Sequence, residues 1–226
     1  MVGAGGIVLR IAELVVLFLG VPALVWLRVI PMWMFWGILA AGAAYAALML
    51  TLDPAFRWRT AWRWPSMAQV RRVALLWVIG LVVMVGFTVG VDLHLIPLDT
   101  RQPHALLLSF PGRAPAIWAV IMVLYPIFSA APQELMFRVF FFHRYERMLG
   151  GRWPTILASA LLFGWAHILF ENWIAVALSV VLGLVIAITY ARTRSGSLVW
   201  LEHALYGDAA FTIGLGWFFF TGNVAQ

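Results

Sequence analysis

Cysteine and lysine are both absent from this 226-residue chain, and charged residues of any kind are scarce. Without cysteine the chain can form no disulfide, and it has no catalytic thiol, no thiolate metal ligand and no palmitoylation site. Without lysine it cannot hold retinal as a Schiff base, which excludes a seven-helix opsin. All 15 basic residues are therefore arginines, and charged residues make up only 11% of the chain.

Apolar residues dominate the sequence instead. They make up 64% of the chain, whereas a soluble domain has about 45–50%. Apolar runs recur that are long enough, at about 18–25 residues, to cross the hydrocarbon core of a bilayer as helices. This pattern predicts an all-α, polytopic integral membrane protein that forms a single membrane domain over residues 1–226. The formal charge of +6 does not indicate nucleic acid, because the arginines lie mostly in short loops.

We predict seven membrane spans. The segment 116–145 is too long for one straight crossing and contains Pro126 and Pro132, which could kink it. If it forms two short helices, the chain crosses eight times. The predicted spans are 9–29, 32–52, 73–96, 116–145, 154–171, 172–192 and 198–220.

The arginines favour seven crossings. They cluster in a basic loop at about 53–72, after the long span at 144–152, and at 192–194. A single crossing by 116–145 places all three clusters on one side, as the positive-inside rule requires. The N-terminus is then cytoplasmic and the C-terminus outside, with the first span retained. The basic loop is either an interfacial helix on anionic headgroups or a solvated loop.

Ionisable residues within predicted spans are expected to be functional, because they are costly in lipid. In "QELMFR", Glu134 and Arg138 are four residues apart and can pair on one helix face, while Gln133 points about 100° away. In "FGWAHILFEN", Phe163 and His167 share a face in the same way. The alternatives are an ion pair that fastens two helices and a histidine that only packs.

A third group, "WLEHALYGDAAF", crowds several polar residues into the last span, and its alternative is a hydrogen-bonded packing patch. With the predicted orientation, Glu134, His167 and His203 all lie on the cytoplasmic side of the middle of the membrane and can converge. A carboxylate and two imidazoles could activate water and stabilise an oxyanion. No cofactor is indicated, and a metal such as zinc is not supported by the ligand spacing. The polar residues of the third group are Glu202, His203, Tyr206 and Asp208.

The order Glu-x-x-x-Arg, Phe-x-x-x-His and a final histidine motif resembles the CAAX protease and bacteriocin-processing family of intramembrane proteases. The resemblance covers residues 116–218 approximately, and it implies a helical catalytic core that opens toward the cytoplasm. It also implies a glutamic-type endopeptidase. The catalytic roles would fall on Glu134, Arg138, His167 and His203, with Gln133, Tyr206, Asp208 and Phe163 supporting the substrate or the oxyanion.

Two positions depart from the family pattern. Gln133 stands where the first motif usually begins with glutamate, and glutamine cannot accept a proton from water at neutral pH. Gly207 stands where asparagine or aspartate is expected, four residues after His203. Either other residues of the site take the roles of these two positions, or the protein has lost its hydrolytic activity.

The expected function is therefore cleavage of a membrane-tethered protein or peptide near the cytoplasmic side, with Glu134 and His167 activating water. The alternative is a non-hydrolytic membrane binding or immunity protein that keeps the pocket. A small transporter is a weaker alternative because no inverted repeat is visible. The expected location is a bacterial inner membrane, and the expected partners are the lipid bilayer and the substrate, without nucleic acid.

Overall fold

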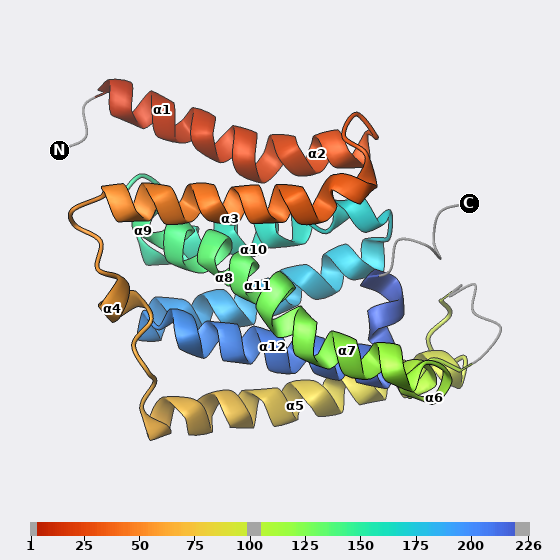
Figure 1. Cartoon of the computed structure of the whole chain (residues 1–226). Helices are drawn as coiled ribbons and strands as arrows, with labels where there is room; N and C mark the ends of the chain where they lie inside the picture. The colour runs from red at the N-terminus through yellow and green to blue at the C-terminus, as the bar shows by residue number, and fades with distance from the viewer. Residues whose placement is uncertain (1–3, 99–104, 220–226) are drawn as a thin grey trace.

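A computed structural model describes residues 4–98 and 105–219, and this part of the chain contains helices and no strands. The helices lie side by side as a bundle (Figure 1). The elements of the N-terminal half are α1 (Ala4–Leu14), η1 (Val15–Gly20), α2 (Val21–Trp26), η2 (Met32–Met34), α3 (Phe35–Leu52), α4 (Trp58–Ala61), α5 (Met67–Asp92) and α6 (Ser109–Arg113). Those of the C-terminal half are α7 (Pro115–Tyr125), η3 (Pro126–Ala130), α8 (Ala131–Glu134), η4 (Leu135–Phe140), α9 (Phe141–Tyr145), α10 (Arg152–Trp165), η5 (Ile168–Phe170), α11 (Trp173–Thr193), α12 (Gly196–Ile213) and η6 (Leu215–Phe219).

Six helical stretches of the described chain are long and apolar enough to cross a membrane, and each coincides with one of the predicted spans. They cover Gly6–Trp26, Met32–Leu52, Met67–Asp92, Pro115–Tyr145, Arg152–Phe170 and Trp173–Thr193. The prediction of a polytopic, all-helical membrane protein is therefore confirmed.

The seventh predicted span is helical as α12 but is not apolar enough to join these six. Glu202, His203 and Asp208 lower its mean hydropathy. This helix tolerates them because it is packed inside the bundle, against α5, α7, η3 and α11. Its buried side chains include Leu198, Val199 and His203. A helix that is surrounded by protein can carry polar groups that a lipid-facing helix could not.

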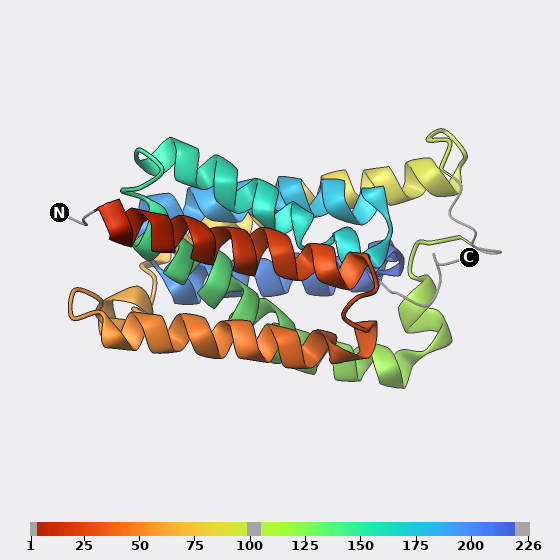
Figure 2. The ribbon, with the colours of Figure 1, turned by 90° about the horizontal axis from the view of Figure 1, so that it is seen from above.

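Residues 115–145 form one continuous helix rather than two. The structure therefore contradicts the alternative of eight crossings. The helix crosses the bundle obliquely in both views (Figure 1 and Figure 2). Pro126 and Pro132 each remove a backbone donor without breaking it. The chain instead continues through π-helical turns at Pro126–Ala130 and Leu135–Phe140. Such turns are frequent at functional sites.

The three arginine clusters lie at one end of the bundle. The α4 loop, the α9–α10 turn and the α11–α12 turn share the left end in Figure 1. Contacts tie this end together: Arg194 pairs with Glu146 at 2.6 Å, and Arg63 donates to the carbonyl of Thr193 at 2.8 Å. Arg57 and Arg59 remain exposed. This distribution agrees with the single crossing by 115–145.

An aromatic core holds the N-terminal hairpin against the oblique helix. Phe18 packs edge-on against Phe137 and Phe141, with ring centroids 5.1 and 5.2 Å apart. Tyr145 and Phe163 extend the same cluster. Phe137 also packs edge-on against Phe163 of α10, with ring centroids 5.3 Å apart, so the oblique helix is held between η1 and α10.

Candidate active site

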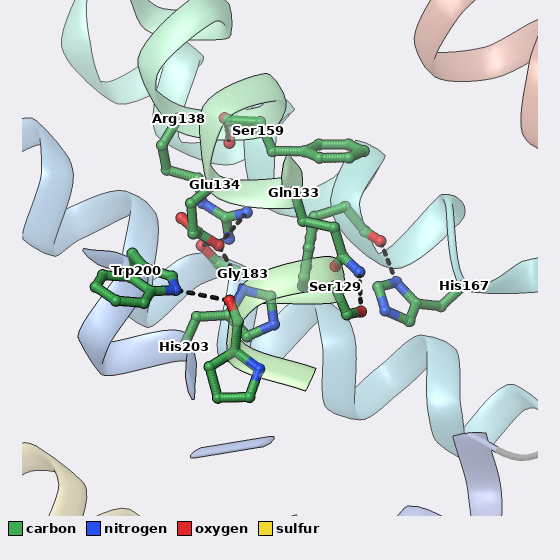
Figure 3. Close-up of polar contacts among 12 residues, drawn as sticks. Ser129, Gln133, Glu134, Arg138, Ser159, His167, Gly183, Trp200 and His203 are labelled. Carbon is green, nitrogen blue, oxygen red and sulfur yellow. Dashed lines mark hydrogen bonds and ion pairs between the residues drawn. The ribbon is translucent and has the colours of Figure 1, made fainter. Parts of the chain in front are cut away.

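Glu134 is the centre of the buried polar cluster. Its Oε1 accepts a hydrogen bond from Nδ1 of His203 at 2.7 Å and forms an ion pair with Nη1 of Arg138 at 3.2 Å. The side chains of Glu134 and Arg138 are 0% exposed and that of His203 is 2% exposed. Figure 3 shows the carboxylate directed toward both partners. Two of the predicted groups are therefore joined directly, across α8 and α12.

Arg138 fastens this cluster to α10 and α11. Its Nη2 donates to the carbonyl of Gly183 at 3.3 Å, and its guanidinium lies 4.3 Å from the centroid of the Phe163 ring. Gly183 also lets α10 and α11 pack closely, since a Cβ at 183 would lie 3.1 Å from Cα of Ala160. Because its partner groups hold the arginine in place, the position of Glu134 is fixed from two sides.

His167 lies outside this ion-paired cluster. It follows the end of α10 and begins the turn toward α11, at the opposite end of α10 from Arg152. His167 still belongs to the candidate membrane span Arg152–Phe170, and the expectation that it shares the depth of Glu134 and His203 stays a prediction. One phenyl ring links the two histidines: Phe163 packs at 4.8 Å from His167 and at 5.5 Å from His203, between ring centroids.

The hydrogen bond of His167 defines its tautomer. Nδ1 lies 2.7 Å from the carbonyl oxygen of Phe163. A carbonyl only accepts, so Nδ1 carries the hydrogen and the neutral ring offers a lone pair on Nε2. The carboxylate of Glu134 accepts from Nδ1 of His203 and so fixes the orientation of that ring. Both histidines thus direct Nε2 away from their anchoring groups.

Gln133 faces the side of the helix where His167 lies. Its Nε2 donates to Oγ of Ser129 at 2.9 Å, and in the view of Figure 3 these two residues lie between Glu134 and His167. The Gln133 carbonyl and Oε2 of Glu134 are both buried without a hydrogen-bond partner among the described residues. Unpaired buried acceptors are costly, so these two atoms mark a place where water or a substrate amide could donate.

The remaining predicted residues lie at the edges of the cluster or away from it. Tyr206 donates to the carbonyl of Leu76 at 2.8 Å and so ties α12 to α5. Oδ1 of Asp208 is buried without a hydrogen-bond partner in the described chain. Glu202 accepts from Thr189 at 3.3 Å. The structure does not bring Tyr206 to the Glu134 carboxylate.

Two residues near the site were not singled out from the sequence. Trp200 donates its indole N–H to the carbonyl of Pro126 at 2.7 Å, and Tyr125 packs against the ring of His203 at 6.0 Å. The proline after Tyr125 is the signal that could have pointed there, because the π-helical turn begins at that proline. An aromatic residue in an apolar run otherwise gives no indication of function.

The cluster is a charge-compensated acid–histidine pair, and it is not built like a metal site. Within residues 4–98 and 105–219, no three His, Cys, Asp or Glu side chains gather as metal ligands would. A histidine that donates Nδ1–H to a carboxylate resembles the histidine and acid of a hydrolase triad. The arrangement suits proton transfer and stabilisation of an oxyanion.

Comparison with known proteins bears on residues 115–207. They match the Rce1-like family, described as type II CAAX prenyl endopeptidase Rce1-like. No curated protein and no solved structure gave a significant match. The matched stretch begins at α7 and ends at Gly207, so it contains Glu134, Arg138, His167 and His203. The resemblance to the CAAX protease and bacteriocin-processing family is therefore confirmed.

Proposed function

We propose that this chain, an Rce1-like integral membrane protein, is an intramembrane endopeptidase that cleaves a membrane-tethered protein or peptide. The observation that carries the proposal is the 2.7 Å hydrogen bond between Glu134 and His203, within a fully buried ion pair. Ionisable side chains inside a membrane bundle are costly, so a buried charged pair there indicates a functional role. The two histidines, each held by a hydrogen bond at Nδ1, supply a base and a donor to the oxyanion in this proposal.

His167 is the general base in this proposal. Its Nε2 takes a proton from water, and the water oxygen forms a bond to the carbonyl carbon of the substrate amide. The carbonyl electrons move to oxygen, and the resulting oxyanion lies near His203. When the intermediate collapses, the C–N bond breaks and the proton on His167 passes to the departing nitrogen. The products are a carboxylic acid and an amine.

Glu134 is assigned to His203 rather than to water. Its side chain has no exposed surface, and its Oε1 is already shared by His203 and Arg138. In this proposal His203 acts in its imidazolium form, donating Nδ1–H to the Glu134 carboxylate and Nε2–H to the oxyanion, and the carboxylate stabilises the positive charge of the ring. Gln133, which cannot act as a base, orients water or the substrate amide through its unpaired carbonyl.

The substrate enters from the arginine-rich end, which we assign to the cytoplasm of a bacterial inner membrane. With that orientation the N-terminus is cytoplasmic and the C-terminus is outside. The peptide bond is cleaved toward the cytoplasmic side of the membrane in this proposal. No metal or other cofactor takes part in the proposed reaction.

Gln133, which cannot act as a base, favours a second function as the alternative. A membrane binding or immunity protein would keep the ion-paired cluster for its shape and would need no base. Such a protein would tolerate the loss of His167 Nε2, whereas a peptidase would not. The two functions therefore differ in what a substitution at His167 does.

The test is a comparison of protein termini in host membranes. The samples are the wild type, a deletion strain, and the deletion complemented with His167→Ala, Glu134→Gln or His143→Ala. His143 is the matched control, since it pairs with Asp53 at 2.9 Å at the arginine-rich end, outside the site. We expect termini that disappear in the deletion to return with His143→Ala and not with His167→Ala. If His167→Ala restores them fully, His167 is not the base; if no termini differ at all, the protein is not a peptidase.

A further inference from the structure

Tyr125 packs across the face of α12 that carries His203. It is the last residue of α7, immediately before the π-helical turn at Pro126. Its ring lies 6.0 Å from that of His203 and 5.3 Å from that of Phe211, edge-on to both. Gly207 lies between these two on the same face of α12, one turn from each. The phenol therefore spans three successive turns of the helix that holds the site histidine.

Gly207 is what allows the phenol to come so close. A Cβ at this position would overlap the Tyr125 ring and its hydroxyl oxygen. Any residue other than glycine would therefore push the ring away from α12. The backbone at 207 and the phenol at 125 fit each other as a pair.

A second contact holds Tyr125 in place. The carbonyl of Pro126, the next residue, accepts a hydrogen bond from the indole of Trp200 at 2.7 Å. Trp200 is on α12, one turn before His203 on a neighbouring part of the helix surface. The backbone at residues 125–126 is thus fixed relative to His203 from the helix that carries it.

The Tyr125 hydroxyl is not used by the fold. It makes no hydrogen bond to any group of residues 4–98 and 105–219, and the residue is only half-buried. By contrast, the hydroxyl of Tyr206 donates to a backbone carbonyl. A phenolic O–H that is held rigidly beside a site histidine is a ready donor to an oxyanion, because it needs no rearrangement at the moment of reaction.

We propose that Tyr125 is a further catalytic residue, which donates its phenolic O–H to the substrate oxyanion next to His203. This inference rests on the proposed endopeptidase function. The two donors reach the oxyanion from different helices, α7 and α12, so the carbonyl oxygen of the substrate is directed between them. Gly207 serves this arrangement by leaving room for the phenol.

The test uses Tyr125→Phe, which removes one oxygen atom and keeps the ring packed against Gly207, His203 and Phe211. Tyr145→Phe is the matched control, because it also removes one phenolic oxygen, but from the aromatic core and away from His203. The full chain is purified in lipid nanodiscs, and the substrate is a peptide spanning a cleavage site found by the comparison of termini. Both kcat and KM are measured.

For Tyr125→Phe we expect kcat to fall by about 100-fold, the loss typical of one oxyanion donor, with KM unchanged. Tyr145→Phe should leave kcat at the wild-type value. If Tyr125 served only in packing, Tyr125→Phe and Tyr145→Phe would behave alike. If Tyr125→Phe has the kcat of the wild type while His167→Ala is inactive, the inference about Tyr125 is overturned and the endopeptidase proposal stands. If the wild type itself cleaves nothing, the endopeptidase proposal is overturned and the role of Tyr125 falls with it.

Discussion

Glu134 and Arg138 should contribute to stability as a coupled pair and not as independent residues. Both side chains are fully buried, and Arg138 also contacts the Gly183 carbonyl and the Phe163 ring. Arg138→Met keeps a long apolar side chain but leaves the Glu134 carboxylate with His203 alone. Glu134→Gln removes the negative charge and leaves a buried guanidinium without its counterion. Each single change exposes one charge to an apolar interior.

The expected magnitudes follow from that burial. Removing one partner of a buried ion pair costs about 3–5 kcal/mol, because the other charge is left uncompensated. The double variant buries neither charge, so it should be more stable than the sum of the single changes predicts. Coupling energies between residues in one network reach about 0.5–3 kcal/mol, and we expect a value at the upper end for this pair.

The assay is equilibrium unfolding of the purified protein in mixed detergent micelles by increasing sodium dodecyl sulfate. Tryptophan fluorescence reports the transition, since the chain has 13 tryptophans. The matched control is the pair Arg28 and Glu171, which lie 3.1 Å apart with side chains 75% and 34% exposed. An exposed pair contributes about 0–1 kcal/mol, so its double-mutant cycle should show little coupling. Additive losses at Glu134 and Arg138, equal in pattern to the control, would refute the reasoning.

Three further predictions follow from other parts of the bundle. Gly164→Ala should destabilise the protein by about 1–3 kcal/mol in the same unfolding assay, because a Cβ there would overlap Val180 and crowd the backbone of α11; Gly37→Ala, where a Cβ meets no atom within 4 Å, should not. The backbone N–H of Ala55, and then the side chain of His143, hold the pKa of Asp53 below its ordinary value of 3.8. This carboxylate therefore stabilises the fold above pH 3.8, and the contribution is lost as pH falls through the lower pKa of the folded state. Asp53→Asn should reduce the loss of unfolding free energy at acidic pH, and an unchanged loss would contradict this. Trp200→Phe should lower the cleavage rate with the fold intact, because it frees the Pro126 carbonyl and loosens Tyr125; a wild-type rate would show that this contact does not position the phenol.

The sequence alone determined the kind of protein and the residues worth attention. Its recurring long apolar runs, which carry few charges, predicted membrane-spanning helices, because lipid offers no partners to a bare backbone. The positions of the arginines favoured a single crossing by 115–145, and the spacing of Glu134 and Arg138 predicted their ion pair. These conclusions depend on composition and on helical periodicity, which are local properties of the chain.

The tertiary structure decided which polar groups meet. Helical spacing could not show that α10 ends before His167, or that Glu134 bonds to His203 while Gln133 faces the other histidine, because these facts depend on how the helices rotate and end against one another. It also could not show Tyr125, since an aromatic residue in an apolar run looks like packing until Gly207 is seen beneath it. The position of α12 inside the bundle explains why one helix of the predicted set can carry polar residues. Its neighbours are other helices of the protein, which only the packing of the bundle shows.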